Sequence, residues 1–306
     1  MRKIAFLYPG QGSQKVGMGR KIFNSYFPAR NVLDLADKIL GFNLEKLCLE
    51  GPESELTRTA NLQPALLTLS WVLTMALEER GIFPQVVAGH SLGEYSAILA
   101  ARVVDIPTAL KMVKKRASLM EEAGKEQEGM MLAVLGFDAE KIYRICRKVG
   151  GVVVANFNCP GQVVISGCRE KVLEAERELK EAGARRTIPL PVSGAFHSPL
   201  MKKAAEEFSL FLDSIVFNEP VIPLVSNSTG SYARSAREIK DNLKVQMESP
   251  VLWEKSMRLL LKDGFNIFIE VGPGRVLQGL MKRIDTKAKV FGVEDLDSVE
   301  EISFQL

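Results

Sequence analysis

Short apolar runs that end in turns alternate with amphipathic stretches along the chain. Residues 4–8 are apolar and stop at a Pro-Gly turn, and residues 86–89 form a second short run that is followed by a helical stretch over 91–100. Runs of this length bounded by turn residues are typical of buried strands. Amphipathic helices are predicted for much of the stretch from 28 to 80. A strand, a sharp turn and a helix in succession indicate an α/β sheet.

The pattern changes in the middle of the chain. It predicts a strand, a helix, two strands paired around a Cys-Pro-Gly turn, a second helix and a last strand, over residues 130–137, 138–148, 152–157, 162–166, 170–181 and 185–190. This βαββαβ order is that of the ferredoxin-like unit. We therefore expect a small inserted subdomain, residues 126–193, within a larger α/β subdomain made of residues 1–125 and 194–306.

Helical patterns return after residue 198, and a strand over 267–271 leads through a Gly-Pro-Gly turn into a helix over 275–284. One earlier stretch, residues 59–77, has no charged residue and approaches the length of a membrane span. Its polar residues favour a buried helix instead, with Pro64 in the first turn.

Composition excludes several classes of protein. The 306 residues are 46% hydrophobic and 25% charged, as in ordinary globular proteins, and the net charge of +3 is too small to indicate a nucleic-acid binder. Four cysteines without CxxC spacing and two histidines leave a zinc site short of ligands. The N-terminal apolar run is too short for a signal peptide. We expect a cytoplasmic monomer that binds no metal, nucleic acid or membrane.

A candidate nucleophile lies between the second strand and its helix. Residues 89–93 read Gly-His-Ser-Leu-Gly and match the G-x-S-x-G pattern. Ser91 on such a turn projects its hydroxyl at the N-terminus of a helix, where the helix dipole and the N–H of Leu92 favour negative charge on a carbonyl oxygen. Short matches also arise by chance, and a glycine-containing helix cap would have the same sequence.

A serine nucleophile needs a base, and the chain has only two histidines, His90 and His197. His90 is adjacent to Ser91, and consecutive side chains in a sharp turn point apart. His197 lies in the loop where the inserted subdomain meets the returning large subdomain, a common position for catalytic groups. His197 is the candidate base by elimination, although a lone histidine is often a packed or surface residue. No acidic residue that would orient it can be identified.

Arg116 is a charged residue on the apolar side of a predicted helix. On a wheel of roughly 100° per residue, the other charged residues of 110–122 fall between roughly 20° and 140°, whereas Arg116 falls at roughly 240° among apolar residues. A bare buried charge costs several kcal/mol, so it needs a partner. Three interpretations stay open: an internal salt bridge, a snorkelling side chain, or a substrate carboxylate held by both arms of the guanidinium.

Several segments together resemble one family. In order they are Gly-Gln-Gly-Ser-Gln at 10–14, Gln-Pro-Ala at 63–65, Gly-His-Ser-Leu-Gly-Glu at 89–94, Arg116, Asn-Phe-Asn-Cys-Pro-Gly-Gln at 156–162, Gly-Ala-Phe-His at 194–197 and Glu-Val-Gly-Pro-Gly at 270–274. They resemble the malonyl-CoA:acyl carrier protein transacylases, the stand-alone relatives of the acyltransferase domains of fatty acid and polyketide synthases. The resemblance covers nearly the whole chain and implies an α/β-hydrolase-like large subdomain with a ferredoxin-like insert.

The resemblance also implies a role for each matching residue. Ser91 would attack the malonyl thioester, and His197, oriented by the backbone carbonyl of Gln246, would take its proton. The other implied roles are an oxyanion hole from the backbone N–H groups of Gln11 and Leu92, a carboxylate clamp at Arg116, and pocket positions at Gln63, Asn158 and Phe196. A phenylalanine before the histidine goes with malonyl rather than methylmalonyl, because its ring leaves no room for the extra methyl group.

The implied reaction moves the malonyl group of malonyl-CoA to the phosphopantetheine thiol of acyl carrier protein by ping-pong kinetics, with no bound cofactor, and supplies fatty acid synthesis. A serine hydrolase or thioesterase is the alternative enzyme, because water could replace the thiol at the same serine. A third hypothesis is a non-enzymatic protein that binds acyl carrier protein or another acidic partner through Arg185, Arg186 and Lys282.

Overall fold

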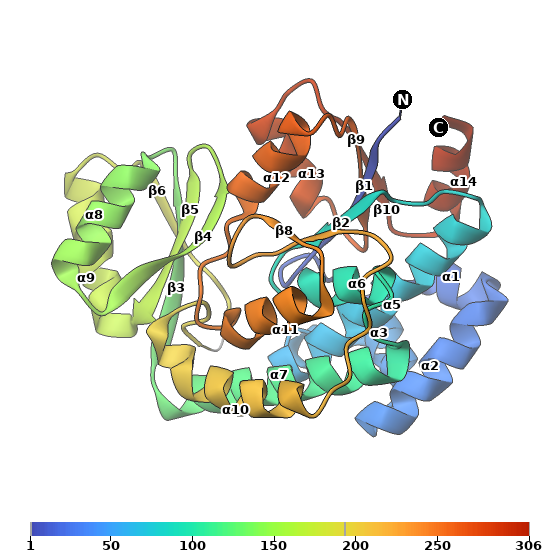
Figure 1. The fold of residues 1–306 in the computed structure, drawn as a ribbon. Helices are drawn as coiled ribbons and strands as arrows, with labels where there is room; N and C mark the ends of the chain where they lie inside the picture. The colour runs from blue at the N-terminus through green and yellow to red at the C-terminus, as the bar shows by residue number, and fades with distance from the viewer. Residues whose placement is uncertain (1, 193, 306) are drawn as a thin grey trace.

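The computed structural model describes residues 2–192 and 194–305 and contains a larger and a smaller sheet with helices packed around them (Figure 1). The larger sheet has the strand order β10-β9-β1-β2-β7-β8. Its strands are β1 (Ile4–Tyr8), β2 (Val86–Gly89), β7 (Leu224–Val225), β8 (Tyr232–Ala233), β9 (Ile267–Val271) and β10 (Lys289–Val293). Neighbouring strands run parallel, except β7 and β8, which are antiparallel.

Helices cover both faces of the larger sheet, which explains why its central strands are continuous apolar runs. Along β1, Phe6 and Tyr8 belong to one core, whereas Ala5 and Leu7 belong to the core on the other face. The helices outside the smaller sheet are α1 (Arg20–Ser25), α2 (Phe27–Leu40), α3 (Leu44–Glu50), α4 (Glu53–Leu56), α5 (Thr59–Glu79), α6 (Gly93–Ala100), α7 (Ile106–Glu126), the 3₁₀ turn η1 (Pro199–Met201), α10 (Lys202–Asp213), α11 (Ala236–Val245), α12 (Trp253–Lys262), α13 (Val276–Ile284) and α14 (Leu296–Gln305).

The smaller sheet is antiparallel, with the strand order β4-β5-β3-β6. In chain order its elements are β3 (Gly129–Leu135), α8 (Ala139–Val149), β4 (Val152–Cys159), β5 (Gln162–Cys168), α9 (Arg169–Glu181) and β6 (Arg186–Pro189). Figure 1 shows α8 and α9 on the side of this sheet that faces away from the larger one. The βαββαβ order and the mixed α/β fold class predicted from the sequence are confirmed.

Side-chain alternation along β3 gives the smaller sheet two different faces. Leu132 and Val134 pack in the core under α8 and α9, whereas Met131 and Ala133 face a cavity between the two sheets. Backbone hydrogen bonds between Ala155, Phe157 and Val251 attach β4 to the segment before α12. The smaller sheet therefore forms one wall of the cavity.

The division of the chain into two subdomains stays a prediction. All strands and helices of the smaller sheet lie between residues 129 and 189, inside the expected insert at 126–193. Its boundaries are not set by strand pairing, and residue 193 lies outside the described residues.

The pattern missed three strands of the larger sheet. β7 and β8 have two residues each, too few to show a period, and β10 is mostly half-buried rather than alternating. The prediction that Pro64 lies in the first turn of its helix was also wrong. Helix α5 begins at Thr59, so Pro64 lies inside the helix rather than in its first turn.

Helix α5 is the one helix of the described residues that is long and apolar enough to cross a membrane. Within the fold, 78% of its most apolar window is buried. It packs against α7, α6 and α2, and Gln63 on it faces the cavity. Its apolar composition is thus used in the core of the fold.

Candidate active site

The candidate nucleophile lies at a tight turn between β2 and α6. Ser91 has a φ of 52°, a left-handed backbone conformation that residues other than glycine rarely adopt. The glycines on either side permit close approaches of the backbone, Gly89 to the start of α6 and Gly93 to β1. A Cβ at Gly89 would lie 1.9 Å from the carbonyl carbon of Gly93, and a Cβ at Gly93 would lie 2.0 Å from the Tyr8 oxygen. The tight approach of β2 to the start of α6 therefore requires Gly89, and the packing of α6 against the end of β1 requires Gly93.

Asn227, which follows the neighbouring strand β7, holds this turn. Its Oδ1 accepts the backbone N–H of Ser91 at 2.6 Å, and its Nδ2 donates to the carbonyl oxygen of Gly89 at 2.6 Å. The side chain is 2% exposed, so water does not compete for these bonds. One amide thus satisfies both backbone groups and stabilises the left-handed conformation of Ser91. The sequence interpretation missed Asn227, because no local pattern marks a residue after a two-residue strand.

His197 lies beside Ser91 although 106 positions separate them along the chain. Its Nε2 is 2.8 Å from the Ser91 Oγ, and its Nδ1 is 3.0 Å from the backbone oxygens of both Gln246 and Ser249. Both of these oxygens can only accept, so Nδ1 carries the proton and Nε2 accepts the hydroxyl proton of Ser91. Two carbonyl groups orient the imidazole where other sites use a carboxylate. The Ser249 carbonyl was not anticipated, since backbone groups leave no signal in a sequence.

The surroundings of His197 keep its imidazole neutral. Burial lowers the pKa of His197 from its usual value near 6.5 to about 3, and the positive charge of Arg116 acts in the same direction. A neutral imidazole is the form that accepts a proton. At neutral pH His197 is therefore in the form that a general base requires.

Arg116, on α7, is 1% exposed and reaches the nucleophile. Its Nη1 donates to the Oε1 of Gln63 at 2.8 Å, and its Nη2 donates to the Ser91 Oγ at 3.2 Å and the Gln246 Oε1 at 3.1 Å. Its Nε has no hydrogen-bond partner, and the guanidinium carbon lies 5.2 Å from the centre of the Tyr95 ring.

The guanidinium of Arg116 therefore has neutral partners only. Within residues 2–192 and 194–305 it forms no ion pair. Burial lowers the pKa of the guanidinium from its usual value. The side chain does not snorkel, and the described residues supply no salt bridge. A ligand carboxylate as the charged partner of Arg116 stays a prediction.

The cavity in front of Ser91 has a volume of about 230 Å³ and lies between the two sheets. Eight of the residues singled out in the sequence line it: Gln11, Gln63, Ser91, Leu92, Arg116, Asn158, Phe196 and His197. Apolar side chains from the smaller sheet and from α13 line much of the rest, among them Met131, Val164 and Leu280. Gln246, the ninth residue, lies behind the cavity wall and contacts His197 and Arg116. The fold thus brings all nine residues together.

Two backbone N–H groups at the cavity are without protein acceptors. Within the described residues, neither the N–H of Leu92, at the start of α6, nor that of Gln11, in the loop after β1, donates a hydrogen bond to the protein. Both residues line the cavity beside Ser91. Two N–H donors at this position can stabilise an oxyanion that forms on a carbonyl group bound at Ser91.

His90 has a structural place next to the nucleophile. Its Nε2 is 2.8 Å from the Oδ1 of Asn158, and its ring packs at an edge-on angle against Trp253 with 5.4 Å between the ring centres. Burial lowers the pKa of His90 below its usual value. The neutral ring, by donating from Nε2, directs the amide of Asn158 in the cavity wall.

The described residues contain no group of three or more histidine, cysteine, aspartate or glutamate side chains that could hold a metal ion. The groups that face the cavity at Ser91 include a serine, a neutral histidine, a buried cation and backbone N–H donors.

Comparisons with known proteins agree with this arrangement. A family model described as the acyl transferase domain matches residues 5–299. The malonyl CoA-acyl carrier protein transacylase of Bacillus subtilis (strain 168) is 45% identical over 304 residues, which make up 98% of this chain and 96% of that protein.

Solved structures also match this chain over nearly its full length. An acyl carrier protein S-malonyltransferase from Vibrio cholerae has a TM-score of 0.95 at 39% identity, and the match covers 98% of this chain and 99% of that one. A type II polyketide synthase acyl carrier protein has been solved in complex with its malonyl-transacylase. That structure has a TM-score of 0.96 at 39% identity and covers 99% of this chain and 100% of the matched chain.

Proposed function

This chain belongs to the acyl transferase domain family, and on that basis we propose that it transfers a malonyl group from malonyl-CoA to the phosphopantetheine thiol of acyl carrier protein. The product of this transfer is the extender unit for fatty acid synthesis. Relatives that are 39–45% identical over nearly the full length of this chain are named for this activity.

The observation that carries the proposal is the environment of Arg116. Arg116 is a buried cation that forms no ion pair with any described residue, and it lies 3.2 Å from the Oγ of the candidate nucleophile. An acyl donor that carries a carboxylate, as malonyl does, supplies the missing negative charge. A neutral acyl group such as acetyl does not. Selection for a carboxylate next to the reacting serine is what a malonyl transferase requires.

The first half-reaction acylates the enzyme. His197 Nε2 takes the hydroxyl proton of Ser91 while the Oγ forms a bond to the thioester carbon of malonyl-CoA. The N–H groups of Leu92 and Gln11 stabilise the resulting oxyanion. When the intermediate collapses, the C–S bond breaks and the CoA thiolate takes the proton from His197. The products are CoA thiol and malonyl-Ser91.

The second half-reaction returns the enzyme to its starting state. The phosphopantetheine thiol of acyl carrier protein gives its proton to His197 Nε2, and its sulfur attacks the malonyl ester at Ser91. The C–O bond then breaks and Ser91 regains the proton from His197. Since one serine serves two substrates in turn, ping-pong kinetics are expected.

Phe196 and Asn158 shape the space for the acyl group. The ring of Phe196 lies in the cavity wall and is 4% exposed. In a closely packed wall this ring leaves little room for a branched acyl chain, which supports malonyl over methylmalonyl. The Asn158 amide, held by His90, faces the same cavity.

The interaction proposed here treats acyl carrier protein as an acidic partner. The basic residues proposed to dock it are Arg185, Arg186 and Lys282. All three are exposed. They lie a few residues from Leu190 and Leu280, which line the cavity. If they dock the carrier protein, replacing Arg185 and Arg186 by alanine raises its KM and weakens the salt dependence of the KM. An unchanged KM at both salt concentrations contradicts this docking.

Isotope labelling tests the proposed activity. Incubation of the protein with labelled malonyl-CoA is expected to leave stable label on Ser91, and later addition of carrier protein is expected to remove it. Ser91→Ala is the control and should stay unlabelled while melting at a similar temperature. An unlabelled wild-type protein rules out the covalent route. Loss of label to water as fast as to carrier protein indicates a hydrolase instead.

A further inference from the structure

Glu94 is a buried carboxylate next to the site that the reaction above does not use. It lies in the first turn of α6, three residues after Ser91, and is 1% exposed. An acidic residue in the first turn of a helix normally faces solvent, where its negative charge interacts favourably with the positive end of the helix dipole. The Glu94 side chain points inward instead, so its place in the core needs another explanation.

The contacts of Glu94 lead to the catalytic serine by two routes. Its Oε2 accepts the Nε2 of Gln246 at 2.6 Å, and its Oε1 accepts the backbone N–H of Asn227 at 3.2 Å. Asn227 is the residue whose side chain holds the Ser91 turn. Gln246 is the residue whose side chain contacts Arg116 and whose backbone carbonyl accepts from His197.

The Gln246 amide lies between a carboxylate and a guanidinium. Its Nε2 donates to Glu94 and to the Ser91 carbonyl oxygen at 3.0 Å, while its Oε1 accepts from Arg116. An ionised carboxylate only accepts, so Glu94 fixes which end of the amide faces it. In the flipped orientation the amide NH₂ would meet the donors of Arg116, and that contact cannot form a hydrogen bond.

The residues at the two ends of this series of contacts, Arg116 and Glu94, are of opposite charge type. Arg116 is a buried cation without an ion pair in the described residues, and Glu94 is a buried carboxylate joined to it through one amide. Burial raises the pKa of Glu94 to about 7, and its hydrogen bonds and the charge of Arg116 act in the opposite direction. Above about pH 7, where Glu94 is ionised, the arrangement places negative charge behind Arg116 without occupying the arm that faces Ser91.

We propose that Glu94 is a positioning residue for the carboxylate clamp: by fixing the Gln246 amide it keeps the Nη2 of Arg116 directed at the acyl site on Ser91. This inference rests on the proposed malonyl transfer. Its consequence is specific. Loss of the Glu94 carboxylate should affect an acyl donor that carries a carboxylate more than a neutral donor, because only the former uses Arg116.

The test compares kcat/KM for malonyl-CoA and acetyl-CoA in Glu94→Gln, a substitution of nearly equal volume. We expect the malonyl-to-acetyl ratio to fall by at least about fivefold, the size typical of coupled neighbours. Equal losses with both donors would mean that Glu94 only supports the fold, and that result overturns the proposal. Glu270→Gln is the matched control, because Glu270 is also buried but accepts the N–H groups of Leu277 and Gln278 at the start of α13. It is expected to lower the melting temperature without changing the ratio.

A double-mutant cycle tests whether Glu94 acts through Gln246. Gln246→Ala removes the side-chain amide and keeps the backbone carbonyl that orients His197. In that background Glu94→Gln should change the donor ratio no further, whereas independent effects that multiply would contradict the proposed route. Gln246→Ala alone must also lower the ratio, so the proposal stays testable if Glu94→Gln does not fold.

Arg116→Ala separates failure of this inference from failure of the proposed function. If Arg116→Ala lowers the malonyl-to-acetyl ratio and Glu94→Gln does not, only the role of Glu94 is wrong. If Arg116→Ala leaves the ratio unchanged, the carboxylate clamp and the proposed function built on it are wrong.

Discussion

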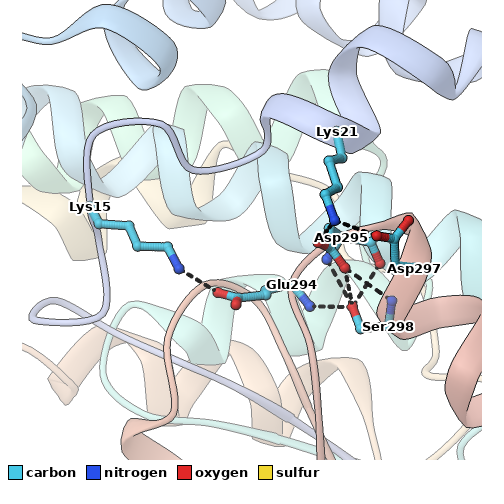
Figure 2. A network of polar contacts seen from close by, with 6 residues as sticks. All are labelled: Lys15, Lys21, Glu294, Asp295, Asp297 and Ser298. Atoms are coloured by element: carbon cyan, nitrogen blue, oxygen red, sulfur yellow. Dashed lines mark hydrogen bonds and ion pairs between the residues drawn. The ribbon is translucent and has the colours of Figure 1, made fainter.

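Two polar networks in this chain have similar contact distances and very different surroundings. The surface network joins the loop after β1 and the start of α1 to the turn before α14 and its first residues (Figure 2). It consists of Lys15, Lys21, Glu294, Asp295, Asp297 and Ser298. Lys15 lies 2.9 Å from Glu294, and Lys21 forms ion pairs with Asp295 and Asp297. Both lysine side chains are 57% exposed. The bond to Asp297 raises the pKa of Lys21, but water surrounds the pair.

The buried network lies behind the cavity and consists of Gln63, Ser91, Glu94, Arg116 and Gln246. Its charged members are each 1% exposed, so water cannot replace a lost partner. Removing one partner there leaves a buried group unsatisfied, whereas an exposed ion pair is simply rehydrated. The comparison teaches that burial, and not the number or length of contacts, determines what a polar contact contributes. It also predicts a ranking of mutational effects.

The largest effect on activity is expected at Arg116. Arg116→Ala should lower kcat/KM for malonyl-CoA by about 2–5 kcal/mol of transition-state stabilisation, because a desolvated charge loses its partner. Acetyl-CoA should lose less, since it has no carboxylate to place there. Steady-state kinetics with both donors measure the difference. Equal losses would mean that the buried network does not select charge.

Asn227→Ala tests the buried groups next to the network. It removes two hydrogen bonds of 2.6 Å and leaves the Ser91 N–H and the Gly89 carbonyl oxygen without partners. We expect the free energy of unfolding to fall by about 1–3 kcal/mol for each unsatisfied group, and acylation of Ser91 to slow as well. Chemical denaturation and the rate of labelling by malonyl-CoA measure the two effects. Unchanged stability would show that the Ser91 turn does not depend on this amide.

The pH dependence of His197 gives a third test of burial. Because burial lowers its pKa to about 3, the basic form persists as the pH falls below 6.5. The acid limb of the acylation rate should therefore have its midpoint well below pH 6.5. Single-turnover labelling at a series of pH values locates this midpoint. A midpoint at 6.5 would mean that His197 is solvated.

The same shift has a consequence for stability. Between about pH 6.5 and pH 3 the unfolded chain binds a proton at His197 and the native chain does not. The stability that the native state gains from burying neutral His197 is complete above about pH 6.5 and is lost as the pH falls towards 3. Wild-type protein should lose more stability over this interval than His197→Gln, in urea unfolding at each pH.

The smallest effect is expected in the surface network. Lys21→Ala removes two ion pairs, yet we expect little change in melting temperature, and the change should shrink further at high salt. Thermal denaturation at low and high salt measures it. A loss of stability as large as that of Asn227→Ala would contradict the small contribution expected of exposed contacts. It would show that the surface network holds the loop that carries Gln11.

Much of the fold could be predicted because its signals are local. The apolar runs of β1, β2 and β9 and the βαββαβ order of the smaller sheet are visible in short windows. The wheel position of Arg116 indicated burial before any contact was known. Strands β7 and β8 could not be predicted, since two residues have no period, and the pairing of β7 with β2 and of β8 with β7 is made by the rest of the fold.

The candidate site was predictable only in part. Ser91 could be found because its turn needs glycines at fixed spacing, and His197 because the chain offers so few histidines. The Ser249 carbonyl, the Asn227 amide and the inward carboxylate of Glu94 had no local signal. Each acts on a partner more than 50 positions away in the chain. Residues of this kind are recognised only when their neighbours in space are known.

The sequence alone identified the candidate groups for the chemistry: a serine on a glycine-flanked turn, one histidine that could act as its base, and one arginine on the apolar face of a helix. The tertiary structure decided their protonation and direction. Neutral His197 and the lowered pKa of Arg116 follow from burial, and that burial comes from segments far apart in the chain, among them α5 with Gln63 and the segment after α11 with Gln246. Residue type sets what a group can do, whereas desolvation by distant parts of the chain sets which of its forms is present.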